Sequence, residues 1–278
     1  MLDRPLLPVS AVRQALVVST GDAGVPSVSP HYDLLTRELV FRFAARLSAG
    51  TLYRVELLVP QALGKPGLRA FDGAPLAPGP VPLAFNFVTA GARSRRPASP
   101  PVEVEPNCAD VAAIFRTACA GGCCHGKLAP AMGLRLGDED DLVRTALGKV
   151  ARQTDTGGSI GVPSVSPARF GVAMPILDPG SPATSYLVYK LLLRSENFAP
   201  CASGCDAFPA LPGADRCLPL SAVERERLRE WFVRGEGMPL DPGRTVDGAC
   251  DDLGVQRHLD CASLRVLTRF LENGTRCD

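Results

Sequence analysis

The residues of this chain best suited to chemistry are gathered in one short segment, CAGGCCHG, which spans residues 119–126. The segment contains three of the ten cysteines and one of the three histidines. A thiol can form a disulfide, bind a soft metal ion or be alkylated, and an imidazole can bind a metal through either ring nitrogen. Three kinds of site are therefore open: a disulfide, a zinc site and a covalently attached cofactor.

One of these interpretations is covalent attachment of haem. The usual motif is Cys-x-x-Cys-His, in which two thiols form thioether bonds to the porphyrin and the histidine binds the iron. Here Cys119 and Cys124 have four residues between them, and His125 follows directly. The pair is a lengthened variant of the motif, and its two glycines allow the loop to bulge so that both sulfurs reach the porphyrin.

The disulfide and zinc interpretations stay open beside it. A disulfide between two cysteines of the segment needs no cofactor and suits a chain rich in cysteine, with His125 near the surface. Zinc needs four ligands in paired spacing. The only later histidine, His258, has no second Cys-x-x-Cys motif beside it, so zinc is the least favoured of the three.

A haem iron bound by His125 would need a second axial ligand. A methionine thioether is suited to this position because it raises the reduction potential into a range useful for electron transfer. Two Met-Pro pairs compete for the role. Met238 is favoured because it follows a Gly-Glu-Gly loop between two amphipathic helices, and Met174 is the reserve. For either one the alternative is an ordinary apolar residue before a turn.

Setting aside Cys119 and Cys124, two of the ten cysteines, leaves eight. An even number allows up to four disulfides, each stabilising the fold by about 2 to 4 kcal/mol. Local pairings are expected within 201–217 and 250–261, although the connectivity cannot be read from sequence. The eight are Cys108, Cys123, Cys201, Cys205, Cys217, Cys250, Cys261 and Cys277.

The uneven placement of the cysteines predicts where the protein resides. None precedes Cys108, and so many cysteines in the second half indicate an oxidising, extracytoplasmic location such as the periplasm or the cell surface. The opening residues, MLDRP, lack the charged and then apolar form of a signal peptide, and no apolar run reaches the roughly 18 residues of a transmembrane helix. We therefore expect a leader or lipoprotein anchor upstream, which mass spectrometry of the native N-terminus would test.

Composition excludes several other functions. The charges are balanced, with 30 Lys and Arg against 29 Asp and Glu, so binding to nucleic acid or to a membrane surface through bulk electrostatics is not expected. No nucleophile–base–acid set, phosphate-binding loop or nucleotide fingerprint is recognisable. The sequence therefore gives no indication of a catalyst.

A chain of 278 residues with 46% apolar residues predicts two domains of moderate size. Residues 1–90 show short apolar or alternating runs between Gly and Pro, which predict an antiparallel β-sandwich. Residues 91–106, rich in Arg, Ser and Pro, predict a semi-extended linker. Residues 107–278 are expected to form the second domain. The expected strands are 15–19, 38–43, 52–59 and 83–88.

The second domain has the periodicity of a small, mainly helical domain. Asp110 is the expected N-cap of its first helix, and Ser221 with Glu224 forms a capping box at a later one. The acidic run at 138–141 is interpreted as a solvated helix start rather than a catalytic or Ca²⁺ site, because negative charge offsets the helix dipole there. The expected helices are 110–118, 138–151, 183–193, 221–234 and 261–271.

The first third of the chain resembles the bacterial immunoglobulin-like domains of surface and secreted proteins. The match is carried by Arg4-Pro-Leu, Tyr32-Asp33 shortly before a strand, the segment LSAGTLYRV at 47–55, and FNFVT at 85–89. In that family the leucine, glycine, threonine and tyrosine around the third strand are the recognisable core, and all four are present. The resemblance implies an all-β immunoglobulin-like sandwich.

Residues 108–277 resemble cytochrome-c-like domains of exported and lipoprotein-type bacterial proteins. As in class I cytochromes c, a short helix, a Cys-His-Gly signature, a long middle section, a Met-Pro pair and a final amphipathic helix follow in order. The resemblance implies one covalent haem c, held by Cys119, Cys124 and His125, that passes single electrons to an unknown redox partner protein. The matching segments are 124–126, 133–136, 178–190, 220–236, 238–239 and 267–274.

Overall fold

The structure, a computed structural model, describes two compact groups of residues, one up to residue 91 and one from residue 105. We refer to them as the first unit and the second unit. The predicted boundary at 91–106 falls almost wholly outside the described residues and stays a prediction. The described residues are 4–7, 10–11, 13–26, 30–35, 37–59, 67–71, 74–77, 79, 82–91, 105–120, 124–127, 130–151, 174–194, 221–231, 259–274 and 277.

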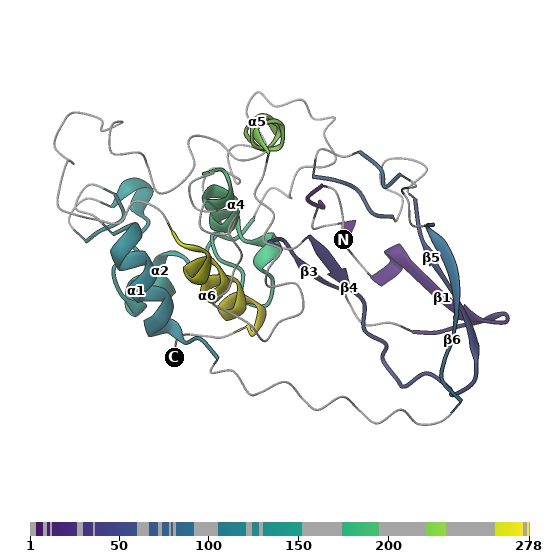
Figure 1. The fold of residues 1–278 in the computed structure, drawn as a ribbon. Helices are drawn as coiled ribbons and strands as arrows, with labels where there is room; N and C mark the ends of the chain where they lie inside the picture. Colours follow the sequence, from purple (N-terminus) through teal and green to yellow (C-terminus); the bar gives the residue numbers. More distant parts are fainter. Residues whose placement is uncertain are drawn as a thin grey trace. The chain divides into compact units, whose positions relative to one another are not determined.

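The first unit is built on a four-stranded antiparallel sheet with the strand order β2-β1-β5-β6, and a two-stranded sheet pairs β3 with β4 (Figure 1). The turn between β1 and β2 is made by Gly21, whose φ of 55° suits a residue without a side chain. The strands are β1 (Leu16–Thr20), β2 (Ala23–Gly24), β3 (His31–Asp33), β4 (Glu38–Val40), β5 (Leu52–Leu57) and β6 (Ala84–Val88).

One face of the four-stranded sheet is covered by an apolar core. Val18, Tyr53 and Val55 are its buried centre, because alternate residues of adjacent strands point to the same side. The Tyr53 ring stacks on Phe87 with centroids 5.5 Å apart. Its hydroxyl accepts a hydrogen bond of 2.8 Å from the backbone N–H of Ser48, so that one side chain joins the sheet to the preceding turn.

The strand predictions for the first unit are confirmed at the level of antiparallel β structure. Two strands are shorter than predicted: β4 ends at Val40 instead of Phe43, and β5 ends at Leu57 instead of Val59. The predicted alternation around β4 is present, since Phe41 and Phe43 are half-buried and Arg42 is exposed. The sandwich itself stays a prediction.

The second unit is mainly helical, and its first and last helices, α1 and α6, pack against each other (Figure 1). A disulfide joins Cys108, the first residue of α1, to Cys277 just after α6, with 5.5 Å between their Cα atoms. All seven residues of α4 are buried. The described helices are α1 (Cys108–Ala118), α2 (Glu139–Thr145), α4 (Tyr186–Leu192), α5 (Ala222–Trp231) and α6 (Cys261–Glu272).

The helix starts follow from their capping residues. Asn107, not Asp110 as predicted, is the N-cap of α1: its side chain accepts from the Asp110 N–H at 3.0 Å, and the Asp110 carboxylate accepts from the Asn107 N–H at 2.9 Å. The predicted capping box of α5 is confirmed, with Ser221 and Glu224 making both reciprocal bonds, at 2.7 and 3.2 Å. The sequence therefore predicted the first residues of α1 and α5 to within a few positions.

The acidic run starts a helix, as predicted, but one of its carboxylates is buried and the helix is shorter than predicted. Asp138 caps α2, accepting from the Asp141 N–H at 2.9 Å. Glu139 and Asp140 are exposed, whereas Asp141 is only 6% exposed. The helix also ends at Thr145 and not at residue 151. The chain turns away because Leu147 forms a strand-like bridge to Leu177 and the following glycine has a positive φ of 63°.

Candidate functional site

The segment predicted to carry the chemistry folds back onto the end of α1. Cys119 ends this helix, its N–H donating to the Phe115 carbonyl at 2.7 Å. The Cys119 carbonyl then accepts from the His125 N–H at 3.1 Å, and the Cys124 carbonyl accepts from the Ala131 N–H at 2.7 Å. These backbone bonds hold the two cysteines and the histidine in one closed loop.

Both cysteines of the predicted pair carry free thiols. Cys119 is buried, whereas Cys124 is half-buried, and neither is part of a disulfide. Burial, and to a lesser extent the nearby charge of a Cys124 thiolate, raise the pKa of the Cys119 thiol to about 12. The two thiols are therefore close enough for the charge of one to affect the ionisation of the other, and Cys124 is the more accessible of the two. Cys123 lies outside the described residues.

His125 is almost fully buried, with 8% of its surface exposed. Its Nδ1 lies 3.1 Å from the Leu134 carbonyl oxygen. A carbonyl oxygen can only accept, so Nδ1 carries the proton and the lone pair of a neutral ring is on Nε2. Burial lowers the pKa of His125, opposed by its carbonyl hydrogen bonds and assisted by the positive charge of Lys190. The folded chain thus favours the neutral imidazole.

The state of His125 is the one that a metal-binding histidine needs. Such histidines usually donate their other ring N–H to a carbonyl or carboxylate, which fixes the tautomer and the direction of the ring. Leu134 provides that acceptor here. The Leu134 contact was not predicted, because its position depends on the turn after Pro130 and not on a side-chain motif.

The two methionines proposed as second ligands have different outcomes. Met174 is buried, at 4% exposure, and its carbonyl accepts from the Ala151 N–H at 2.9 Å. This places it in the core of the second unit, as expected for an apolar residue, and leaves its role as a ligand a prediction. Met238 and His258 lie outside the described residues.

Lys190 is a residue near the site that sequence analysis missed. It lies in α4, is 5% exposed, and its charge acts on His125. A lysine in the middle of an otherwise apolar helix, YLVYKLL, is unusual because burying an ammonium group is costly. That pattern is the signal by which it could have been found.

Zinc and haem make different demands on the residues that bind them. Within the described part of the chain, no three side chains of His, Cys, Asp or Glu are grouped to hold a metal ion, so these residues give the zinc interpretation no support. Haem c makes no such demand, because the two cysteine sulfurs bond to the porphyrin edge and the iron needs only the histidine and one further ligand such as a methionine. Two free thiols and an oriented, neutral histidine fit that chemistry.

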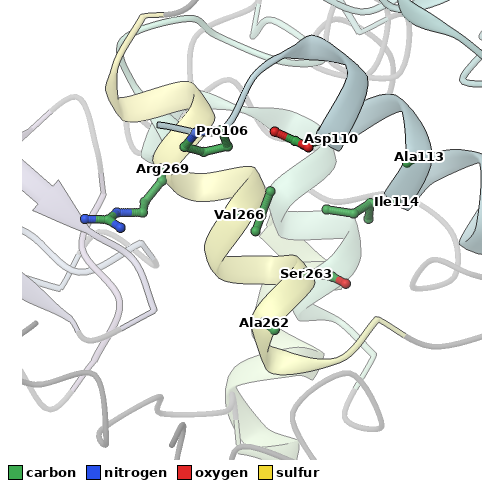
Figure 2. A pocket seen from close by; sticks show the side chains of 8 residues that line it. All are labelled: Pro106, Asp110, Ala113, Ile114, Ala262, Ser263, Val266 and Arg269. Carbon is green, nitrogen blue, oxygen red and sulfur yellow. The ribbon is translucent and has the colours of Figure 1, made fainter. Parts of the chain in front are cut away.

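A separate pocket lies between α1 and α6 and has a volume of about 370 Å³. Figure 2 shows Ile114 and Val266 between the two helices, with Arg269 at one end. Neither thiol nor the His125 ring lines it, so this pocket is distinct from the Cys-His loop. Its lining residues are Pro106, Asp110, Ala113, Ile114, Ala262, Ser263, Val266 and Arg269.

No family model, curated protein or solved structure matches this chain. Among the described helices, none is both long and apolar enough to span a membrane. The assignment of a function therefore depends on the chemistry of the Cys-His loop and on the disulfide.

Proposed function

We propose that the second unit is an exported, cytochrome-c-like module that binds one haem c and transfers single electrons. Cys119 and Cys124 would hold the haem through thioethers formed by adding each S–H across a porphyrin vinyl group, and His125 would bind its iron. The observation that carries this proposal is the buried His125 ring, whose Nδ1 is fixed by the Leu134 carbonyl at 3.1 Å beside two free thiols. The haem iron, when bound, supplies the change of oxidation state.

The residues of the chain have separate tasks in this proposal. Leu134 fixes the tautomer and direction of the ring, so that Nε2 is the ligand atom. Burial lowers the pKa of the ring, which favours the unprotonated form of that atom. Met238, with Met174 in reserve, is proposed as the second axial ligand, and burial of the loop would keep water from the site.

The Cys108–Cys277 disulfide supports an oxidising location. We infer that the protein acts outside the cytoplasm, at the cell surface or in the periplasm, with an as yet unknown redox partner. The first unit is proposed as an immunoglobulin-like module. The buried Tyr53 is hydrogen-bonded to the turn before its own strand. This supports the proposal, because the resemblance of the first unit to immunoglobulin-like domains depends in part on that tyrosine.

A second candidate function is a haem-free structural or binding module stapled by disulfides. The specific observation that favours it is the near-complete burial of Cys119, at 5% exposure. The apolar surroundings of the core already bury this thiol, so no bond to a cofactor is needed to explain its position. In this alternative the Cys-His loop is purely structural.

The two candidates are separated by expressing the exported chain together with a cytochrome c maturation system. Haem attachment predicts a Soret band and a covalent increase in mass that survives denaturation. Cys119→Ser and Cys124→Ser should each abolish full attachment, and the matched variant Cys123→Ser should retain it. A colourless protein of unchanged mass would refute the haem proposal and leave the stapled module.

The axial ligand is tested separately, on protein that carries haem. Replacing the true ligand by alanine should lower the reduction potential, because the thioether is lost. Met238→Ala is expected to have this effect and Met174→Ala is not. The reverse result would transfer the role to Met174, and no change in either would show that neither thioether binds the iron.

A further inference from the structure

Among the strands that the structure describes, β6 forms one edge of the four-stranded sheet, as the last strand in the order β2-β1-β5-β6 (Figure 1). β6 pairs with β5 in unbroken register along its whole length. Just beyond its ends, the Leu57 N–H donates to the Leu83 carbonyl at 2.8 Å and the Thr89 N–H donates to the Thr51 carbonyl at 3.1 Å. Since antiparallel bonding alternates along a strand, the odd-numbered residues of β6 direct their N–H and C=O groups at β5.

The even-numbered residues of β6 consequently direct their backbone groups away from the sheet. These are Ala84, Asn86 and Val88. Within the part of the chain that the structure describes, their outward N–H and C=O groups have no recorded partner. A row of unpaired groups of this kind is a template for another strand.

Nothing in β6 itself protects this edge. Its sequence, AFNFV, has no charged residue and no proline, which are the residues that usually prevent strand addition. Phe85 and Val88 are 44% and 65% exposed. The opposite edge differs, because β2 has only two residues and offers too little backbone to pair.

We propose that β6 pairs with β6 of a second copy of this chain, antiparallel, across a two-fold axis at Asn86. In that register Asn86 lies opposite its own counterpart, and Ala84 lies opposite Val88 of the other copy. Every outward N–H of one copy then meets an outward C=O of the other, and the two sheets become one.

The side chains also suit this pairing. Phe85 lies opposite Phe87 of the other copy in a non-hydrogen-bonded pair, where Cα atoms are only about 4.5 Å apart and aromatic side chains touch. The charged neighbours on β5, Arg54 and Glu56, pair with each other at 3.7 Å, so no net charge repels the second copy. The edge is therefore complementary to itself, which favours a second copy over a different protein.

The proposal is tested by sedimentation velocity on the full chain, up to about 100 µM, with a non-reducing gel to show that any dimer is non-covalent. We expect a reversible dimer. Asn86→Lys places two like charges directly opposite each other and should raise the dissociation constant at least about tenfold. Val17→Lys is the matched control: it adds the same charge to the same sheet, at a 43% exposed position two strands from the edge, and should leave the dimer intact.

A charge exchange distinguishes a lost interface from a damaged fold. Asn86→Lys and Asn86→Glu should each be monomeric alone, and an equal mixture should form the mixed dimer. Amide hydrogen exchange gives a second measurement: the N–H of Asn86 should become protected as concentration rises, whereas that of Phe87 is protected throughout. A chain that stays monomeric, or a dimer that Asn86→Lys does not weaken, would overturn the proposal.

Discussion

The two thiols of the Cys-His loop should differ greatly in reactivity towards an alkylating reagent. At pH 8, a thiol with the ordinary pKa of 9.0 is about one-tenth thiolate, and one whose pKa is about 12 is about one ten-thousandth thiolate. The thiolate is the nucleophile, so ionisation alone should slow Cys119 about a thousandfold in the folded protein. Its burial, with 5% exposed, slows it further.

The assay is iodoacetamide labelling of the haem-free, folded chain at pH 8, quenched over time and read by peptide mass spectrometry. Both cysteines lie between Arg116 and Lys127, so fragment ions are needed to assign the label to each. Cys124, which is half-buried, should be labelled first, and Cys119 should be labelled only on unfolding. In guanidinium chloride the two rates should become similar, which controls for local sequence.

The variant Cys124→Ser separates the two causes of the high pKa. Burial is the larger cause and the charge of Cys124 the smaller, so Cys119 should remain slow in this variant. Its labelling rate should also increase about tenfold for each pH unit between 8 and 10, since thiolate remains the minor form there. Labelling of Cys119 within about tenfold of Cys124 in the folded protein would refute this account of the loop.

Three other predictions concern the stability of the second unit. Burial lowers the pKa of His125 below 6.5, so the unfolded chain binds the proton more tightly than the folded chain does. The free energy of unfolding should therefore be constant above pH 6.5 and decrease as the pH falls below it. The variant His125→Gln should remove this pH dependence. Asn107→Ala removes the cap of α1 and should cost about 1 kcal/mol in urea unfolding. Replacing both Cys108 and Cys277 by alanine opens a loop with a sequence separation of 169. The free energy of unfolding should fall by up to about 5 kcal/mol, as measured by guanidinium unfolding with tryptophan fluorescence. A loss under about 1 kcal/mol would show that the unfolded chain is already constrained.

Local signals in the sequence were sufficient to predict most helices and strands. The capping pair Ser221 and Glu224 located the start of α5 because both hydrogen bonds are formed within one turn. At α1 the same reasoning chose the wrong partner, since Asn107 and Asp110 are both capping residues and only the geometry shows which one precedes the helix. The early end of α2 was not predictable, because it depends on the bridge from Leu147 to a residue far along the chain.

The site was predictable only in its residue types. Cys119, Cys124 and His125 were identified from their spacing, and the structure places them in one loop. The acceptor for Nδ1 is a backbone carbonyl, at Leu134, which any residue type provides, so no pattern could indicate it. The Cys108–Cys277 disulfide likewise could not be predicted from the sequence, because eight cysteines allow 105 connectivities.

That disulfide gives the second unit the topology of a closed ring from residue 108 to residue 277. A protease that cuts one peptide bond within the ring opens it without releasing a fragment, since both new ends stay covalently joined through the cystine. Shedding of material then needs a second cut or a reductant. A module closed in this way keeps its two parts joined after a single cut, whereas a linear chain would release one of them.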